Sequence, residues 1–102
     1  GTAPFMSPEQ FSGVPGDIDA RTDVWALGAM LYLLFTARYV FTGSTFEQIA
    51  DRVQTAMPSP ARTFNPTIPA ELDRAIQKAL SKLPERRYRS AGELAAAVRS
   101  CL

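Results

Sequence analysis

The chain has 102 residues, of which 46% are hydrophobic and 21% are charged. These values exclude a disordered chain and predict one modest globular domain. Eleven basic and ten acidic residues give a formal net charge of +1, which offers no electrostatic basis for binding nucleic acid or an anionic membrane. The sequence contains no histidine, which excludes Ser-His-Asp triads and most zinc sites, and no metal site is predicted.

The single cysteine, Cys101, excludes an internal disulfide and is typical of a reducing compartment, so a cytoplasmic location is predicted. The first residues lack the basic and apolar regions of a signal peptide. The longest apolar run, residues 24–35, is shorter than the roughly 20 residues that a membrane span needs.

The N-terminal part predicts a short helix after an extended segment over residues 1–5. Ser7 is a suitable N-cap, Pro8 suits the first helical position, and Glu9 lies in the first turn. The glycines and proline of residues 13–16 end this helix and open a loop.

The next stretch predicts the central helix of the fold, over residues 22–37. After Asp23 it carries no charged side chain, and Thr22 or Asp23 is expected to cap it. A helix that is apolar on every face is expected to be buried on every face. The rest of the chain is therefore expected to pack around it.

Three further helices are predicted, over residues 44–56, 69–82 and 90–101. Ser44 with Glu47, and Ser90 with Glu93, have the spacing of capping boxes that open the first and last of these helices. Phe46, Ile49, Ala50 and Val53 recur at helical spacing, which predicts that the first of these helices is amphipathic. The predicted buried stripes of the other two comprise Leu72, Ala75, Ile76, Ala79, Leu80, Leu94, Ala97, Val98 and Cys101.

Between two of these helices, residues 57–69 contain four prolines and are expected to form an irregular connection. Phe64 and Ile68 are expected to hold this connection against the core. No segment alternates in polarity long enough to indicate a strand, so the predicted fold class is all-α.

Three arginines, Arg86, Arg87 and Arg89, are the nearest approach to a chemical cluster. They could bind phosphate, but a solvated turn with one arginine recruited for an internal ion pair is favoured. From the residues alone, the chain is a helical domain without a visible catalytic site.

Three segments, however, resemble motifs of one protein family. Residues 1–9, Gly-Thr-Ala-Pro-Phe-Met-Ser-Pro-Glu, resemble the end of the activation loop, which closes on A-P-E. Residues 23–28 resemble the D-x-W-S-L-G helix, and residues 83–88 resemble the D-P-x-x-R element. These motifs, in this order, are similar to those of eukaryotic-type protein Ser/Thr kinases, and most of all to the bacterial members of that family.

The resemblance implies a partial protein kinase domain over residues 1–102, namely the lower half of the C-lobe. The family's Gly-rich loop, ATP-contacting lysine, H-R-D and D-F-G motifs do not occur in the sequence. ATP and Mg²⁺ are therefore implied as cofactors of the parent domain, while this chain alone is expected neither to bind them nor to transfer phosphate.

The resemblance also implies roles for residues near the N-terminus. Thr2 matches the threonine that hydrogen-bonds the catalytic Asp and Lys and so supports the phospho-acceptor hydroxyl. The segment from residue 1 to 6 matches the wall beneath the substrate, which implies substrate contacts for Gly1, Thr2, Ala3 and Phe5.

Further roles implied by the resemblance are structural. Glu9 and Arg87 match a buried ion pair that ties the N-terminal segment to the last helices. Asp23 matches the acid that anchors the catalytic loop, although stabilisation of the helix N-terminus is a simpler role for it. Trp25 is expected to be a core residue that braces the ion pair.

Some positions depart from the family pattern. Phe5 stands where tyrosine is usual, and Ser7 replaces the alanine of A-P-E. Leu33 stands where many members place a glutamate that reads basic substrates, which argues against a preference for basic substrates. Ala37 and Tyr39-Val40 replace the usual Gly and Pro-Pro after the central helix, which is expected to reshape that turn.

The predicted function is therefore that of a C-lobe segment of a protein Ser/Thr kinase, supplying substrate docking and scaffold. Its partners are a protein substrate and the remainder of the kinase domain, and the isolated chain is expected to self-associate through its uncovered central helix. One alternative is a non-catalytic kinase-like module that docks proteins through residues 44–55. Another is an independent helical interaction domain whose motif matches are accidental.

Overall fold

The computed structural model describes residues 3–12 and 19–102, and these residues contain helices and no strand, which confirms the all-α prediction. The α-helices are α1 (Pro8–Ser12), α2 (Ala20–Thr36), α3 (Phe46–Thr55), α4 (Ala70–Ala79) and α5 (Ala91–Cys101). Three short 3-10 helices are η1 (Ala3–Phe5), η2 (Ala61–Thr63) and η3 (Pro84–Arg86). Among the described residues, no helix is both long enough and apolar enough to cross a membrane.

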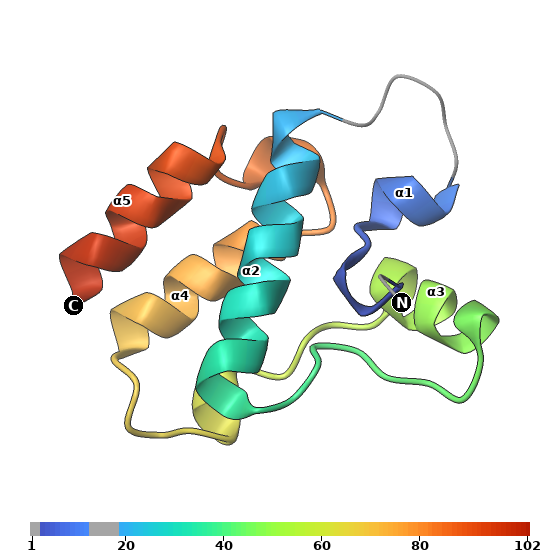
Figure 1. Cartoon of the computed structure of the whole chain (residues 1–102), viewed down its shortest axis with the longest axis horizontal. Helices are drawn as coiled ribbons and strands as arrows, with labels where there is room; N and C mark the ends of the chain where they lie inside the picture. The colour runs from blue at the N-terminus through green and yellow to red at the C-terminus, as the bar shows by residue number, and fades with distance from the viewer. Residues whose placement is uncertain (1–2, 13–18) are drawn as a thin grey trace.

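The helices form two groups around α2, as Figure 1 shows. On one side α2 packs against α4 and α5, which also pack against each other. On the other side α3 packs against α1 and η1, and η1 contacts α2. The fold is therefore a three-helix half joined to a smaller half that carries the N-terminal segment.

The core lies between α2, α4 and the connections around them. Its largest fully buried side chains include Trp25 and Tyr32 of α2. The predicted stripe of α4 is buried throughout, and it comprises Leu72, Ala75, Ile76, Ala79 and Leu80. On α5 only Leu94 of the predicted stripe is fully buried, and Ala97, Val98 and Cys101 are half-buried at its edge.

A glycine allows α2 and α4 to approach closely. A Cβ atom added at Gly28 would lie 2.7 Å from the Cβ of Ala79, closer than two carbon atoms can normally approach. The contact is rigid because Ala79 has no flexible side chain that could move away. Gly28 therefore sets the distance between the two helices that form the core.

The central helix differs from the prediction in two ways. It begins at Ala20, and its N-cap is Asp19, whose carboxylate accepts a hydrogen bond from the Arg21 amide at 2.8 Å. The prediction that Thr22 or Asp23 caps it is therefore wrong, because a better cap precedes them.

The expectation that this helix is buried on every face is also wrong. Met30 is 54% exposed and Leu34 is 74% exposed. In Figure 1, α4 and α5 cover one side of α2, while the smaller half covers another side. Neither half covers the face that carries these two side chains.

The starts of α1 and α5 lie where the sequence predicts them. The helix α1 begins at Pro8, as predicted, but the Ser7 hydroxyl does not cap it by accepting a backbone amide of the described residues. The hydroxyl and the amide of Ser7 both donate to the Gln10 side chain, at 3.2 Å and 2.9 Å. The hydroxyl of Ser90 caps α5 by accepting the Glu93 amide at 3.2 Å.

The start of α3 lies one residue later than predicted. Thr45, rather than Ser44, is the N-cap, and its hydroxyl accepts the Gln48 amide at 3.1 Å. Gln48 in turn accepts the Ser44 amide at 2.7 Å. The glutamine therefore takes the place that the prediction gave to Glu47, because a Thr and a Gln satisfy the same spacing in the next register.

Two features of the predicted connections also differ. The helix α4 ends at Ala79, three residues before the end of the predicted range. Ile68 is buried as expected, but Phe64 is exposed, and its ring lies under the guanidinium of Arg38 at 4.2 Å. The expectation that Phe64 holds this connection against the core is wrong, because a cation and not the core covers its ring.

The turn after α2 keeps a shape that suits glycine. Ala37 is the C-cap residue, with φ 58° and ψ 25°, and its amide donates to the Leu33 carbonyl at 2.8 Å. It is the one non-glycine residue with positive φ in the described part of the chain. The left-handed turn therefore forms without glycine, at a conformational cost of about 1 kcal/mol.

Candidate functional site: an anchored N-terminal segment beside an open helix face

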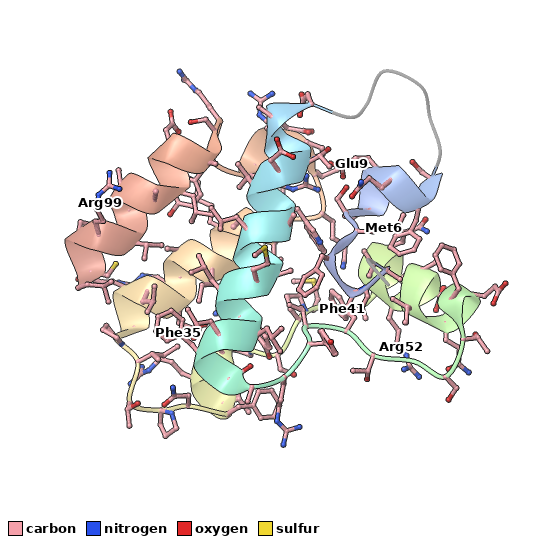
Figure 2. All side chains as sticks on the ribbon, viewed as in Figure 1. Met6, Glu9, Phe35, Phe41, Arg52 and Arg99 are labelled. Carbon is pink, nitrogen blue, oxygen red and sulfur yellow. The ribbon has the colours of Figure 1, made fainter. Side chains whose placement is uncertain are left out.

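The N-terminal segment is tied to the C-terminal part of the chain by a buried ion pair. Arg87 donates through Nη1 to Glu9 Oε2 at 2.7 Å and through Nη2 to Glu9 Oε1 at 2.9 Å. Arg87 is 3% exposed and Glu9 is 6% exposed. Figure 2 shows Glu9 on α1, beside the start of α2. This bidentate geometry is the strong form of a charge-assisted hydrogen bond.

The guanidinium of Arg87 also organises its own surroundings. Its Nε donates to the Ser81 carbonyl at 2.7 Å, Nη1 donates to the Arg21 carbonyl at 3.0 Å, and Nη2 donates to the Lys82 carbonyl at 3.3 Å. An arginine has five N–H donors, and all of these are satisfied here. A single side chain therefore joins α1, the start of α2 and the connection between α4 and α5.

The carboxylate of Glu9 receives a further hydrogen bond. The Thr22 hydroxyl donates to Glu9 Oε2 at 2.8 Å. Burial by itself raises the pKa of Glu9, but the hydrogen bonds from Arg87 and Thr22 outweigh it and lower the pKa from 4.5 to about 2. Glu9 is therefore ionised throughout the neutral range, and α1 stays bound to α2 and to the connection after α4.

Trp25 lies beside this pair, and two cations face it. The Arg87 guanidinium carbon is 5.1 Å from the centre of the Trp25 ring, and the Lys82 ammonium is 5.9 Å from it. The ring is 1% exposed. Trp25 is thus a core residue that supports the ion pair from α2.

The structure separates the three arginines near the C-terminus. Arg87 is buried in the ion pair, whereas Arg86 and Arg89 are exposed. One arginine has therefore been recruited for an internal pair, in line with the favoured reading of this cluster.

The predicted substrate-contacting residues lie at and before η1. Gly1 and Thr2 lie outside the described residues. Ala3 and Phe5 are half-buried in η1, and the Phe5 ring meets the Tyr39 ring edge-on with 5.9 Å between the ring centres. The described part of this segment is therefore held both by the ion pair of α1 and by the turn after α2.

Asp23 lies in the first turn of α2, and its side chain is exposed. Within residues 3–12 and 19–102, the carboxylate of Asp23 makes no hydrogen bond or ion pair. It lines a hollow of about 410 Å³ together with Phe5, Met6, Gln10, Thr22 and Ala26. A carboxylate at this point can accept hydrogen bonds from a partner that enters the hollow.

An apolar groove of about 470 Å³ lies along α2 and shares the lining residue Phe5 with this hollow. Its lining is almost wholly apolar and consists of Phe5, Leu27, Met30, Leu31, Leu33 and Leu34. Leu27, Met30, Leu31 and Leu34 recur at the spacing of one helix face. The open face of α2 therefore has an acidic end and an apolar body.

Sequence reasoning missed two residues of this site. Thr22 was expected to cap α2, but its hydroxyl binds Glu9, and nothing in the local sequence signals a partner 13 residues away. Lys82 was not singled out, although its ammonium binds a carbonyl 29 residues away. The described residues contain no group of three or more His, Cys, Asp or Glu side chains placed to hold a metal ion.

Comparison with known proteins identifies relatives over the whole chain. No family model matches. The chain is 38% identical over 102 residues to a probable serine/threonine-protein kinase of Streptomyces coelicolor, SCO3848, and 40% identical over 96 residues to the serine/threonine-protein kinase PknB of Mycobacterium tuberculosis. The matches cover 100% and 94% of this chain, and the chain spans about 15% of the length of each relative.

A comparison with solved structures also finds a kinase domain. The kinase domain of M. tuberculosis PknI, a C20A mutant, superposes with a TM-score of 0.72 at 28% identity. The match covers 94% of this chain and 33% of that chain. The fold is thus the helical C-lobe part of a protein kinase domain. The chain belongs to the bacterial Ser/Thr protein kinases and corresponds to the C-terminal part of their kinase domain.

Proposed function

We propose that this chain is the substrate-side scaffold of a Ser/Thr kinase domain whose parent protein transfers the γ-phosphoryl group of ATP to protein hydroxyls. The observation that carries the proposal is the bidentate Glu9–Arg87 pair, which fixes the N-terminal segment in a chain related to kinases. A substrate platform must hold its shape while the substrate arrives and leaves.

The proposed substrate contacts lie on this fixed segment. Glu9 fastens α1, so η1 and its residues Ala3 and Phe5 have a constant position relative to α2. Thr2, one residue before η1, is proposed to hydrogen-bond the catalytic Asp and Lys of the remaining domain. The segment would then support the acceptor hydroxyl from below.

Asp23 and the groove of α2 are proposed to face the remainder of the kinase domain. The exposed carboxylate would accept backbone N–H groups of the catalytic loop, and the apolar groove would receive apolar side chains from the same domain. This proposal accounts for both features of the open face, since the exposed carboxylate is free to accept hydrogen bonds and a large exposed apolar surface is typical of an interaction site.

The residues of this chain do not fit ATP or Mg²⁺. The sequence has no Gly-rich phosphate loop and no H-R-D or D-F-G motif. The described residues also lack a cluster of carboxylates for a metal. We therefore propose that the isolated chain does not transfer phosphate and that the cofactors bind to the remainder of the domain.

The test is a phosphorylation assay with the full-length protein, labelled ATP and a generic Ser/Thr substrate. We expect the wild type to label the substrate and Thr2→Ala to reduce the rate about 10- to 100-fold, the effect of losing a hydrogen bond to charged groups. Thr63→Ala, at an exposed position in η2, is the control and should label like the wild type.

The outcomes separate two parts of the proposal. If Thr2→Ala labels as well as the wild type, the role of Thr2 is wrong. If the wild type does not label, the parent is not an active kinase, and the non-catalytic docking module becomes the better interpretation.

We further propose that the isolated chain self-associates through the open face of α2. Met30 and Leu34 are both more than half exposed and belong to one apolar groove. Leu34→Lys places a charge on this face at its most exposed leucine and should shift sedimentation toward the monomer. A wild-type chain that stays monomeric at high concentration would contradict the proposal.

A further inference from the structure

Lys82 caps the C-terminal end of α3 from another part of the chain. Its Nζ donates to the Val53 carbonyl at 2.7 Å. The last four carbonyls of a helix have no partner within the helix, and Val53 is among them because α3 ends at Thr55. A cation at this end also interacts favourably with the helix dipole.

Two aromatic rings surround the same ammonium group. It lies 4.8 Å from the centre of the Phe41 ring and 5.9 Å from that of Trp25. The side chain is partly buried, and this burial lowers the pKa of Lys82. An ammonium that binds a carbonyl and faces two rings has few alternative positions, so it can hold the end of α3 in place.

Lys82 is itself fixed by the ion pair. Its carbonyl accepts a hydrogen bond from Arg87 Nη2 at 3.3 Å, and Arg87 also faces Trp25. Arg87 thus holds α1 through Glu9, and Lys82 reaches α3 from the same connection. The two contacts start from Lys82 and Arg87, in one short connection of the chain.

The helix α3 needs such a contact. It packs mainly against α1 and η1, and its buried residue, Val53, is its contribution to the core cluster that contains Trp25 and Leu80. At its other end, the ring of Phe46 meets the ring of Phe11 on α1 with 5.2 Å between centres. A change in the position of α3 would therefore reach the segment that carries η1.

We propose that Lys82 is a positioning residue that fixes α3, and through α3 the N-terminal segment, relative to the three-helix half. This role is distinct from that of the Glu9–Arg87 pair, which holds α1 directly. Neutral replacement of Lys82 should loosen α3 while α2 and α4 keep their packing.

The test is amide hydrogen exchange of the full-length protein. Lys82→Met keeps most of the side-chain length but removes the charge and the donors. It should accelerate exchange in residues 46–56 about ten-fold relative to α4, the size expected for a lost charge-assisted hydrogen bond and ring contact. Lys82→Arg retains the positive charge and the N–H donors, so its α3 amides should exchange at the wild-type rate.

Lys78 provides a matched control. Its ammonium lies 4.4 Å from the ring of Tyr88, but it belongs to the exposed side of α4 and does not reach α3. Lys78→Met should leave exchange in α3 unchanged. If Lys82→Met does not fold, the milder Lys82→Gln, which loses the charge but keeps an N–H donor, replaces it in the same measurement.

Three results would overturn the proposal. These are unchanged exchange in α3 of the neutral variant, equal acceleration in all helices, and an arginine variant as fast as the neutral one. The first shows that α3 does not depend on Lys82, and the second shows a general loss of stability. The third shows that neither the charge nor the donor matters.

A kinetic measurement extends the test and rests on the proposed function. In the labelling assay Lys82→Met should raise the KM for the protein substrate and leave kcat and the KM for ATP unchanged, because α3 adjoins the substrate-side segment. An unchanged KM for the protein substrate overturns the link to the N-terminal segment. If the wild type transfers no phosphate, the proposed function fails, while the exchange measurement still decides the role of Lys82.

Discussion

Breaking the Glu9–Arg87 pair should be the most damaging change in this fold that leaves its apolar core intact. We consider Glu9→Gln, Arg87→Met and the double variant in the 102-residue chain. Both side chains are almost fully buried, so removing one partner leaves the other as a charge without compensation. Such a loss costs about 3–5 kcal/mol, whereas an exposed pair contributes only about 0–1 kcal/mol.

The structure predicts an order for the single variants. Arg87→Met leaves the carboxylate with only the Thr22 hydroxyl and also frees the carbonyls of Ser81, Arg21 and Lys82. Glu9→Gln leaves the guanidinium bound to those carbonyls, so its cost should lie at the lower end of the range. The double variant should cost less than the sum of the two, because no buried charge remains.

The assay is equilibrium urea unfolding, followed by far-UV circular dichroism and by the fluorescence of Trp25, the single tryptophan. Each variant is compared with the wild type at neutral pH, and the midpoints give the differences in unfolding free energy. A cost below about 1 kcal/mol for both single variants would refute the reasoning, because that is the value of a surface pair. Additive single costs would likewise show that the two side chains do not act as a unit.

Three further predictions concern the same chain. Since the pKa of Glu9 is lowered from 4.5 to about 2, its contribution to stability is present above about pH 5 and is lost as the pH falls from 4.5 through 2. The loss should reach about 3 kcal/mol in acid unfolding of the wild type and should be absent from Glu9→Gln. Gly28→Ala should destabilise by about 1–3 kcal/mol, since its Cβ would lie 2.7 Å from that of Ala79, while Gly92→Ala, whose Cβ would make only an ordinary contact with Ser90 Oγ at 3.7 Å, should be neutral or stabilising in the same urea titration. Ala37→Gly should raise the thermal midpoint, because glycine adopts the left-handed turn without the roughly 1 kcal/mol that alanine loses there, and a lower midpoint would show that the turn is not strained.

The helices could be predicted from the sequence because their signals are local. Pro8 marks the start of α1, Ser90 caps α5, and the stripe of α4 has a regular spacing. The predicted cap was wrong where two neighbouring residues can each cap the helix. The predicted burial was wrong where tertiary packing decides which side chains are covered. Ser44 and Thr45 offer equivalent caps in adjacent registers, and the exposure of Leu34 depends on which neighbours cover α2.

The site could be predicted only in part, because its contacts join distant residues. The pairing of Glu9 with Arg87 came from a family resemblance, since no local rule links positions 78 apart. The same limit explains why Lys82 was missed: its partner, Val53, contributes a backbone carbonyl, and a carbonyl is present at every residue. Side-chain patterns carry no information about such contacts.

The long separation of Glu9 and Arg87 also affects how the chain reaches its fold. Closing a loop of 78 residues carries a large entropic cost that local helices do not meet. During synthesis, Glu9 would be made on the order of ten seconds before Arg87, at a rate of about 5–20 residues per second. The N-terminal segment of this chain would thus be made well before the residue that locks it in place. Until then, its attachment would depend on contacts with α2 and α3 alone.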